Sequence, residues 1–332
     1  MTDAGPTTQL VIGTRKSQLA MVQTLHVKTL LETHFPTTAF SVLGMTTTGD
    51  EVLNVALSKI GSKSLFTKEL EVALYDKAVD LVVHSLKDLP TQLPEGMVIG
   101  AIMERENPRD AVVMKLDLHN KGVKLQDLPA GSVIGTSSVR RIAQLRRRFP
   151  NLVFQDVRGN LNTRLAKLDD PEGPYSALLL AHAGLVRLNW HSRISQTLDP
   201  DVILHAVGQG ALGIEIRGDD ALLQQVVGVL EHTETALRCI AERGFMRGLE
   251  GGCSVPLGVW TEYIKKDEKT LLLLKGGVCS VDGSKEIRQE LSAEVDFSNI
   301  PESKQRAEQL GRDLSVKFIE LGAQHILAEI RK

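Results

Sequence analysis

Short apolar runs alternate with amphipathic stretches along most of the chain. The candidate strands are residues 10–13, 80–84, 132–135, 152–154 and 177–181. Stretches with helical periodicity lie between them, for example at residues 66–76 and 139–149. Such alternation is typical of an α/β architecture, and we expect its strands to be mainly parallel.

The pattern changes after about residue 234. One helical stretch at 235–248 precedes two hairpin-like runs at 257–264 and 271–279, and a last helical stretch covers 302–322. Strands that pair locally and are flanked by helices indicate a separate, smaller α+β domain.

Two polar or glycine-rich segments mark places where the chain passes between domains. They are residues 105–109 and 207–211, and residues 116–129 have the composition of a connector. We therefore expect three domains: residues 1–110 together with 211–234, residues 111–210, and residues 235–332.

Composition narrows the class of protein. The chain has 332 residues, 42% of them hydrophobic, which is enough for two or three domains with ordinary cores. A net charge of −2 and an aromatic content of 4% disfavour binding to nucleic acid or to an anionic membrane. No apolar run approaches the roughly 20 residues that span a bilayer, and residues 1–9 lack the apolar core of a secretory signal. We expect a soluble, cytoplasmic protein.

Arginines lie directly after several predicted strands, where an open α/β sheet places its ligand crevice. They are Arg15, Arg140, Arg141, Arg158 and Arg187. A single such arginine is more often a solvated surface charge. Several that converge indicate a ligand with many carboxylates or phosphates, which guanidinium groups bind in pairs of hydrogen bonds. By contrast, Arg146, Arg147 and Arg148 follow one another on one helix, and we expect them to be solvated.

Two further residues are candidates for chemistry. Asp88 lies at the end of a predicted strand, where its carboxylate could stabilise a developing cation or, alternatively, only cap a turn. Cys253 lies on a glycine-rich loop, as a reactive thiol or as an inert loop cysteine. Cys239 has the setting of a core residue, and the cysteines and histidines show no spacing typical of a metal site.

Taken together, the motifs of this chain resemble those of the porphobilinogen deaminase family, in the family's order and over nearly the whole length. They are GTRKSQLA at 13–20, TTGD at 47–50, SKIG at 58–61, KSLFTKEL at 63–70, VVHSLKDLP at 82–90, RENP at 105–108, GTSSVRR at 135–141, RGNLNTRL at 158–165, VGQGALG at 207–213 and EGGCSVP at 250–256. Residues 261–305 match poorly.

The resemblance implies an activity and a fold. Members of the family are transferases of heme and tetrapyrrole biosynthesis, also called hydroxymethylbilane synthases. They deaminate four porphobilinogen molecules, join them head to tail on a covalently bound dipyrromethane cofactor, and release hydroxymethylbilane by hydrolysis. Their fold has two periplasmic-binding-protein-like domains and a smaller C-terminal α+β domain that carries the cofactor cysteine.

The resemblance also assigns roles to residues. Cys253 matches the covalent attachment point of the dipyrromethane, and Asp88 matches the catalytic carboxylate. The residues that match cofactor and substrate binders are Arg15, Ser17, Lys87, Thr136, Ser137, Arg140, Arg141, Arg158, Arg164, Arg187 and Gln209. Those that match an active-site loop are Lys59, Lys63 and Phe66. No metal is implied.

Two other classes of protein share some of these features. A non-enzymatic anion-binding protein of the periplasmic-receptor type would explain the α/β pattern and the arginines, but it would not explain Cys253 on its loop. A nucleic-acid-binding protein would use the same arginines, but the near-neutral charge and the scarcity of aromatic residues disfavour it.

Overall fold

The computed structural model describes residues 9–51, 65–249 and 255–330. They form two compact units. Unit 1 consists of residues 9–51, 65–105 and 211–236, and unit 2 consists of residues 106–210, 237–249 and 255–330. Unit 1 is therefore built from segments that lie on both sides of residues 106–210 in the sequence.

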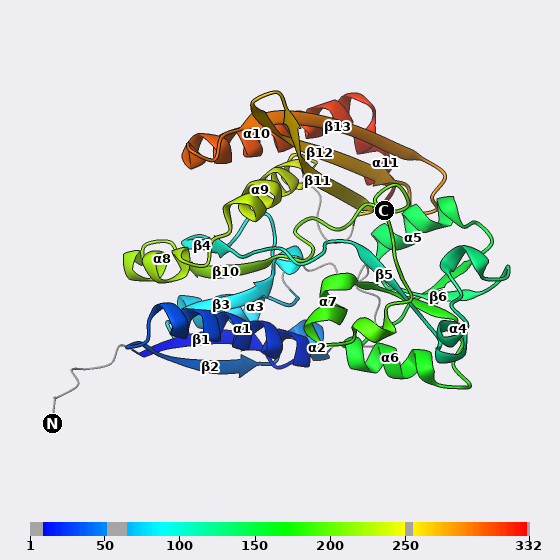
Figure 1. The fold of residues 1–332 in the computed structure, drawn as a ribbon, viewed down its shortest axis with the longest axis horizontal. Coiled ribbons are helices and arrows are strands. Elements are labelled where there is room, and N and C mark those ends of the chain that lie inside the picture. Colours follow the sequence, from blue (N-terminus) through cyan, green and yellow to red (C-terminus); the bar gives the residue numbers. More distant parts are fainter. Residues whose placement is uncertain (1–8, 52–64, 250–254, 331–332) are drawn as a thin grey trace. The chain divides into compact units, whose positions relative to one another are not determined.

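Unit 1 contains a five-stranded sheet (Figure 1). Its strands, in spatial order, are β2 (Ala39–Met45), β1 (Gln9–Arg15), β3 (Leu81–Ser85), β10 (Leu212–Arg217) and β4 (Met97–Ile102). β1 pairs in parallel with β2 and β3, whereas β10 is antiparallel to both of its neighbours. A short 3-10 turn, Leu86–Asp88, follows β3 directly.

Helices cover both faces of this sheet. α1 (Gln18–His34) and α8 (Ala221–Gly228) pack on one face, and α3 (Lys68–Tyr75) packs on the other. The short helix α2 spans Thr48–Glu51. The Ser17 hydroxyl accepts a hydrogen bond from the Ala20 amide and caps the start of α1.

The first sheet of unit 2 also has five strands. In spatial order they are β7 (Val153–Gln155), β6 (Val133–Gly135), β8 (Ala177–Ala181), β5 (Asp110–Met114) and β9 (Gln196–Thr197). The helices that accompany it are α4 (Leu116–Asn120), α5 (Val139–Arg148), α6 (Leu161–Asp169) and α7 (His182–Arg187).

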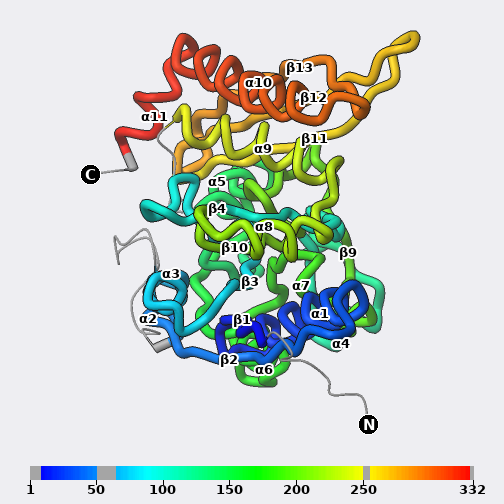
Figure 2. The backbone as a smooth tube through the Cα atoms, turned by 90° about the vertical axis from the view of Figure 1, so that its left-hand side faces the viewer, coloured from blue at the N-terminus to red at the C-terminus, as the bar shows by residue number. Residues whose placement is uncertain are grey.

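The second sheet of unit 2 is a three-stranded antiparallel meander. Its strands are β11 (Leu257–Lys266), β12 (Lys269–Cys279) and β13 (Glu286–Val295). One face of this sheet carries the helices α9 (Thr233–Gly248), α10 (Ile300–Glu320) and α11 (Ala323–Ile330), as Figures 1 and 2 show. The rings of Phe245 and Phe318 meet edge to face within this core, with centroids 4.8 Å apart.

The predicted class, an α/β protein with two sheet domains and a smaller C-terminal α+β domain, is confirmed. The expectation of mainly parallel strands is wrong for two strands, because β5 and β10 each run antiparallel to both of their neighbours. Neither strand is preceded by a crossover helix, and such a helix is what makes successive strands parallel. The expected connector at 116–129 contains α4 and a 3-10 turn at Leu125–Asp127.

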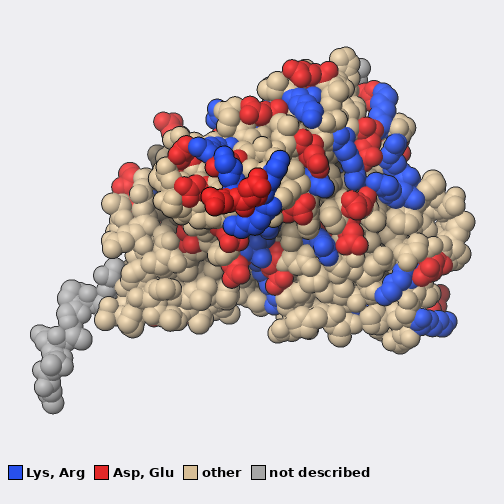
Figure 3. All heavy atoms as spheres, turned by 45° about the horizontal axis from the view of Figure 1, so that its top comes forward, with Lys and Arg blue, Asp and Glu red and all other residues tan. Residues whose placement is uncertain are grey.

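Acidic and basic side chains are mixed on one face of the described surface. On the face drawn in Figure 3, acidic and basic side chains alternate, without a large area of one sign. Within the described ranges, we find no helix long and apolar enough to cross a bilayer.

Candidate functional site

In unit 1, two predicted site segments lie at the same edge of the sheet. β1 and β3 are parallel, with Ile12 opposite Leu81, so their carboxyl ends point the same way. Arg15 ends β1, and the turn that contains Lys87 and Asp88 follows β3. The structure thus brings the predicted residues of unit 1 to one edge, where open α/β sheets bind ligands.

Arg15 is held between a carboxylate and an aromatic ring. Its guanidinium donates to Asp50, with Nε 3.1 Å from Oδ2, and its Cζ atom lies 4.4 Å from the centre of the Phe66 ring. Burial alone would raise the pKa of Asp50, but the hydrogen bonds and charge of Arg15, together with Thr47, hold it below its ordinary value. Asp50 therefore fixes Arg15, a role that its place in the TTGD motif did not reveal.

Asp88 is half-buried and has no hydrogen bond or ion pair with any residue in the described part of the chain. The side chains on either side of its turn are anchored. Leu86 and Leu89 are each 1% exposed, and the Ser85 hydroxyl hydrogen-bonds to Gln23 of α1. A carboxylate on a fixed turn, without a partner among the described residues, is suited to a ligand that carries N–H groups or positive charge.

In unit 2, the predicted residues also follow strand ends at one edge. β6 is parallel to β7 and β8, and the first residue of β5, Asp110, lies opposite Ala181, the last residue of β8. The residues that this edge brings together are Thr136, Ser137, Arg140, Arg141, Arg158, Arg187 and Asp110.

Asp110 connects three of the predicted binding residues. Its carboxylate accepts two hydrogen bonds from Arg140, two from Arg141 and one from Gln209, at 2.7–3.2 Å. Asp110 is 1% exposed, and Arg140 and Arg141 are 5% and 6% exposed. One buried carboxylate thus faces two guanidinium groups, and a net positive charge remains.

This arrangement determines the pKa of Asp110. Burial alone would raise it, but the charges of Arg140 and Arg141 and their hydrogen bonds outweigh burial and hold the pKa far below its ordinary value of 3.8. Asp110 is not among the site residues predicted from the sequence. The available signal was an aspartate between the polar turn 105–109 and the fully apolar strand Ala111–Met114.

A second chain of contacts connects the other predicted residues of unit 2. The Ser137 hydroxyl donates to the Val157 carbonyl at 2.6 Å, directly before Arg158. Arg158 is 8% exposed, and Arg164 Nε donates to the carbonyl of the next residue, Gly159, at 2.8 Å. The Thr136 hydroxyl accepts from the Ser138 amide at the start of α5.

Arg187 is a half-buried positive charge that its neighbours compensate only partly. Its Nη2 donates to the Gly210 carbonyl at 2.7 Å, in the loop that carries Gln209. Burial lowers the pKa of Arg187 to about 10, and the charge of Glu106 only partly opposes this. A charge desolvated to this extent is suited to an anionic ligand.

The residues of this chain match two sequence models of one family. The model described as "Porphobilinogen deaminase, dipyromethane cofactor binding domain" matches residues 10–225, and "Porphobilinogen deaminase, C-terminal domain" matches residues 236–320. The chain belongs to the porphobilinogen deaminase family. The first of these matches also shows that the cofactor of the family is a dipyrromethane.

Curated relatives agree with this assignment over nearly the whole length. A porphobilinogen deaminase from a Nostoc species is 54% identical over 96% of this chain and 94% of its own. One from Gloeobacter violaceus is 52% identical over 97% of this chain and 93% of its own.

Solved structures of other families resemble the chain only weakly. A probable amino-acid ABC transporter extracellular-binding protein from Bacillus subtilis has a TM-score of 0.40 and 12% identity, over 68% of this chain and 91% of its own. The periplasmic aliphatic sulphonate binding protein SsuA from Escherichia coli has a TM-score of 0.38 and 14% identity, over 94% and 89%.

The described cysteines are poor candidates for covalent attachment. Cys239 and Cys279 are buried at 0% and 1% exposure, which confirms Cys239 as a core residue. Burial and the neighbouring Glu286 raise the pKa of the Cys279 thiol to about 12, so it stays protonated and weakly nucleophilic. Cys253 lies outside the described residues, as do Lys59 and Lys63.

The three consecutive arginines of α5 are exposed, as expected, but they are not only solvated. Arg146 and Arg147 donate to carbonyls in the 281–284 turn, and Arg148 donates to the Asp201 carbonyl. Arg146 and Arg147 thus connect the first sheet domain of unit 2 to the C-terminal domain.

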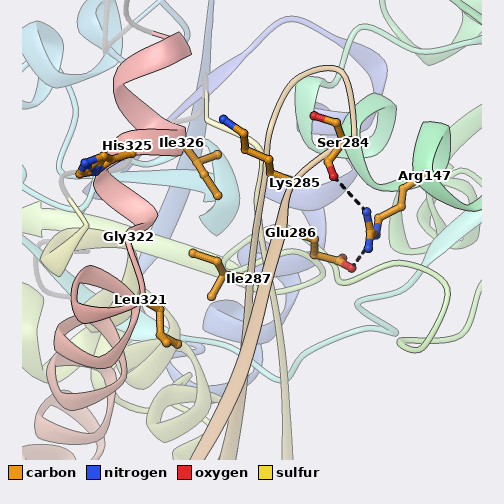
Figure 4. A pocket seen from close by; sticks show the side chains of 9 residues that line it. All are labelled: Arg147, Ser284, Lys285, Glu286, Ile287, Leu321, Gly322, His325 and Ile326. Carbon is orange, nitrogen blue, oxygen red and sulfur yellow. Dashed lines mark hydrogen bonds and ion pairs between the residues drawn. The ribbon is translucent and has the colours of Figure 1, made fainter.

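A separate groove lies in the C-terminal domain and is lined by Arg147, Glu286, Ile287, Leu321 and His325, among others (Figure 4). Arg147 is paired there with Glu286. No predicted site residue lines this groove. Among the described side chains, no cluster of histidine, cysteine or carboxylate has the composition of a metal site.

Proposed function

We propose that this chain catalyses the reaction for which its family is named and acts as a hydroxymethylbilane synthase. Four porphobilinogen molecules and one water give one hydroxymethylbilane and four ammonia. The observation that carries the assignment is the match of both family models, which together cover almost the whole chain. Family membership does not favour the alternative of a non-enzymatic anion receptor.

The residues of unit 2 fit a dipyrromethane that bears carboxylate side chains. Arg187 presents a half-buried charge that the protein compensates only partly, and the Asp110 cluster retains a net positive charge. We propose that the residues that hold the carboxylates of cofactor and substrate are Arg15, Ser17, Lys87, Thr136, Ser137, Arg140, Arg141, Arg158, Arg164, Arg187 and Gln209. Once bound to Cys253, the dipyrromethane supplies the pyrrole to which the first substrate is joined.

Asp88 acts on the reacting pyrroles. Its carboxylate accepts hydrogen bonds from pyrrole N–H groups and stabilises the positive charge that develops as ammonia leaves. Its lack of a partner among the described residues supports this role, because a carboxylate already paired with arginine would have its charge compensated. The buried leucines beside its turn keep Asp88 in place without neutralising it.

Arg15 is proposed to bind one substrate carboxylate. Asp50 and Phe66 hold its guanidinium before a ligand arrives, so fewer side-chain conformations are lost on binding. Phe66, Lys59 and Lys63 belong to the proposed active-site loop.

We further propose the three-domain division stated above, a monomeric state and a cytoplasmic location, with porphobilinogen as the small-molecule partner and no nucleic acid. The mixed charges on the face in Figure 3 support the absence of a nucleic-acid partner.

The direct test is to mix the purified protein with porphobilinogen and measure ammonia and tetrapyrrole together. The proposal predicts four ammonia molecules released for each linear tetrapyrrole formed. A receptor would bind porphobilinogen and release none.

A further inference from the structure

A histidine and a glutamate are paired inside unit 1, close to Asp88 in the sequence. His84 Nε2 lies 2.9 Å from Glu215 Oε2, and their side chains are 4% and 0% exposed. A carboxylate can only accept, so His84 donates from Nε2. Val82, which lies opposite Glu215 on the same face of the sheet, is a fully buried core residue. Burying a polar pair in such a setting is costly, and an apolar pair would fill the space at lower cost.

The strand register places this pair where β3 ends. Gly213 lies opposite His84, and Glu215 lies opposite Val82, so His84 and Glu215 are diagonal neighbours on one face of the sheet. β3 ends one residue after His84, and the turn with Lys87 and Asp88 begins there. The pair therefore connects β10 to the last residues of β3.

The start of β10 and the residue before it also contact the turn that contains Asp88. The Leu86 amide donates to the Ala211 carbonyl at 3.0 Å. Gly213 has no side chain, and a Cβ atom there would lie 2.9 Å from Leu86 Cδ1 and 3.3 Å from Leu89 Cδ1. The two leucines that flank Asp88 therefore rest directly on the backbone of β10.

We propose that Glu215 is a positioning residue for Asp88, which it places by holding His84 and thereby the end of β3. The inference rests on the proposed function, in which Asp88 contacts the reacting pyrroles. Asp88 has no partner of its own in the described part of the chain, so the backbone beneath it determines where its carboxylate lies. A displacement of about 1 Å at such a group can slow a reaction roughly 10²-fold.

The charged groups around His84 come from two elements. Glu215 faces it from β10, and Glu71 faces the pair from α3. Burial, and to a smaller degree the charge of Glu215, raise the pKa of Glu71. Glu215 Oε1 has no hydrogen-bond partner among the described residues. Its other oxygen, Oε2, makes the contact with His84.

Two substitutions of Glu215 distinguish the effect of its side-chain length from the effect of its charge. Glu215→Gln keeps the length of the side chain and an oxygen that accepts from His84, but loses the charge. Glu215→Asp keeps the charge but withdraws it by one methylene. Both are measured in the cofactor-loaded enzyme for kcat and KM with porphobilinogen, and for the urea midpoint of unfolding.

The proposal predicts that Glu215→Gln keeps kcat near wild type, whereas Glu215→Asp lowers kcat by about 10- to 10²-fold with little change in KM. The matched control is Arg217→Met on the same strand. Arg217 bonds to the carbonyls of Leu74 and Val79 and to Asp80, away from the turn. It should lower the urea midpoint and leave kcat unchanged.

Three outcomes would overturn the positioning role: wild-type kcat in Glu215→Asp, a loss in Glu215→Gln as large as in Glu215→Asp, or an equal loss of kcat in Arg217→Met. Asp88→Ala, measured in parallel, tests the proposed function separately. If Asp88→Ala keeps its turnover, the role of Asp88 itself is wrong. If it loses turnover while both Glu215 variants are normal, only the positioning role is wrong.

Discussion

At the scale of single residues, the partners of a carboxylate determine whether it can interact with a ligand. Asp88, Asp50 and Asp110 are all carboxylates in or beside the predicted site segments. Asp50 and Asp110 are bound to arginine, whereas Asp88 has no such partner among the described residues. Only Asp88 is thus suited to act on a ligand, and the other two hold arginines in place.

We predict that Asp88→Ala removes nearly all turnover and leaves the urea midpoint almost unchanged, because no described contact of the side chain is lost. Asp88→Glu keeps the charge but moves it by about 1 Å, and should cost roughly 10²-fold in kcat. Steady-state kinetics and urea unfolding of both variants test this. Near-normal turnover in Asp88→Ala would show that the carboxylate is not catalytic.

Asp110 has the opposite role, and we predict a large effect of Asp110→Asn on stability. The substitution leaves two buried guanidinium groups without a counter-charge, which should cost about 3–5 kcal/mol in the free energy of unfolding. The control is Glu329→Gln, which breaks an exposed pair with Lys285 and should cost no more than about 1 kcal/mol. Equal losses from both substitutions would contradict the account.

The pH dependence of stability follows from the lowered pKa of Asp110. The native carboxylate stays ionised at a pH where an unfolded aspartate is already protonated, so its contribution is complete above the ordinary pKa of 3.8. As the pH falls below that value, the contribution is lost progressively. Urea midpoints measured from pH 6 downwards should therefore fall more steeply below about pH 4 in wild type than in Asp110→Asn.

At the scale of elements, hydrophobic periodicity predicted several helices and strands but missed others, among them β2, β4, β5, β9 and β10. Runs such as Ala177–Ala181 and Leu81–Ser85 are fully apolar or nearly so, as buried strands are. β13 was not predicted because its residues are mostly half-buried and polar, so no apolar run marks it. β5 and β10 each follow a passage of the chain from one sheet to another. Their antiparallel direction depends on this topology, which the local sequence pattern does not determine.

Close packing of helices gives a test at this scale. Gly311 of α10 lies against α9, where a Cβ atom would overlap the carbonyl oxygen of Ala241. Because the neighbour is backbone, it cannot move aside, and Gly311→Ala should cost about 1–3 kcal/mol in stability. Gly228→Ala, where nothing lies within 4 Å, is the control and should be neutral or slightly stabilising. Thermal or urea unfolding of the two variants distinguishes them, and equal midpoints would contradict the packing described.

Residues of the candidate site could be proposed from the sequence, but the contacts between them could not. Arg140, Arg141 and Arg187 were selected because they follow predicted strands, and Asp88 was selected because of its motif. Asp110 and Glu215 were missed because their roles depend on partners about 30 and 130 residues away in sequence. A buried charge network appears only when the fold is known.

At the scale of the whole molecule, the arginines cannot all act on the first substrate, because one pyrrole offers only two carboxylates. We predict that single Arg→Leu variants stop at different stages of elongation. Loss of one partner of a buried charge pair costs about 2–5 kcal/mol, which is enough to slow one step by one to three decades or more. The variants are those of Arg15, Arg140, Arg141, Arg158, Arg164 and Arg187.

Native mass spectrometry after brief exposure to porphobilinogen would show each variant as a distribution of masses that differ by one pyrrole. Distinct distributions are expected. If all six variants gave the same one, the arginines would form a single undifferentiated electrostatic field.

The central claim is that the chain carries a covalent dipyrromethane on Cys253, and the mass of the denatured active enzyme tests it most directly. We predict a mass above that of the sequence by one dipyrromethane, located by peptide mapping on the Cys253 peptide. Cys239 and Cys279, which are buried, should be found as unmodified thiols. An active enzyme with an unmodified Cys253 peptide would contradict the account.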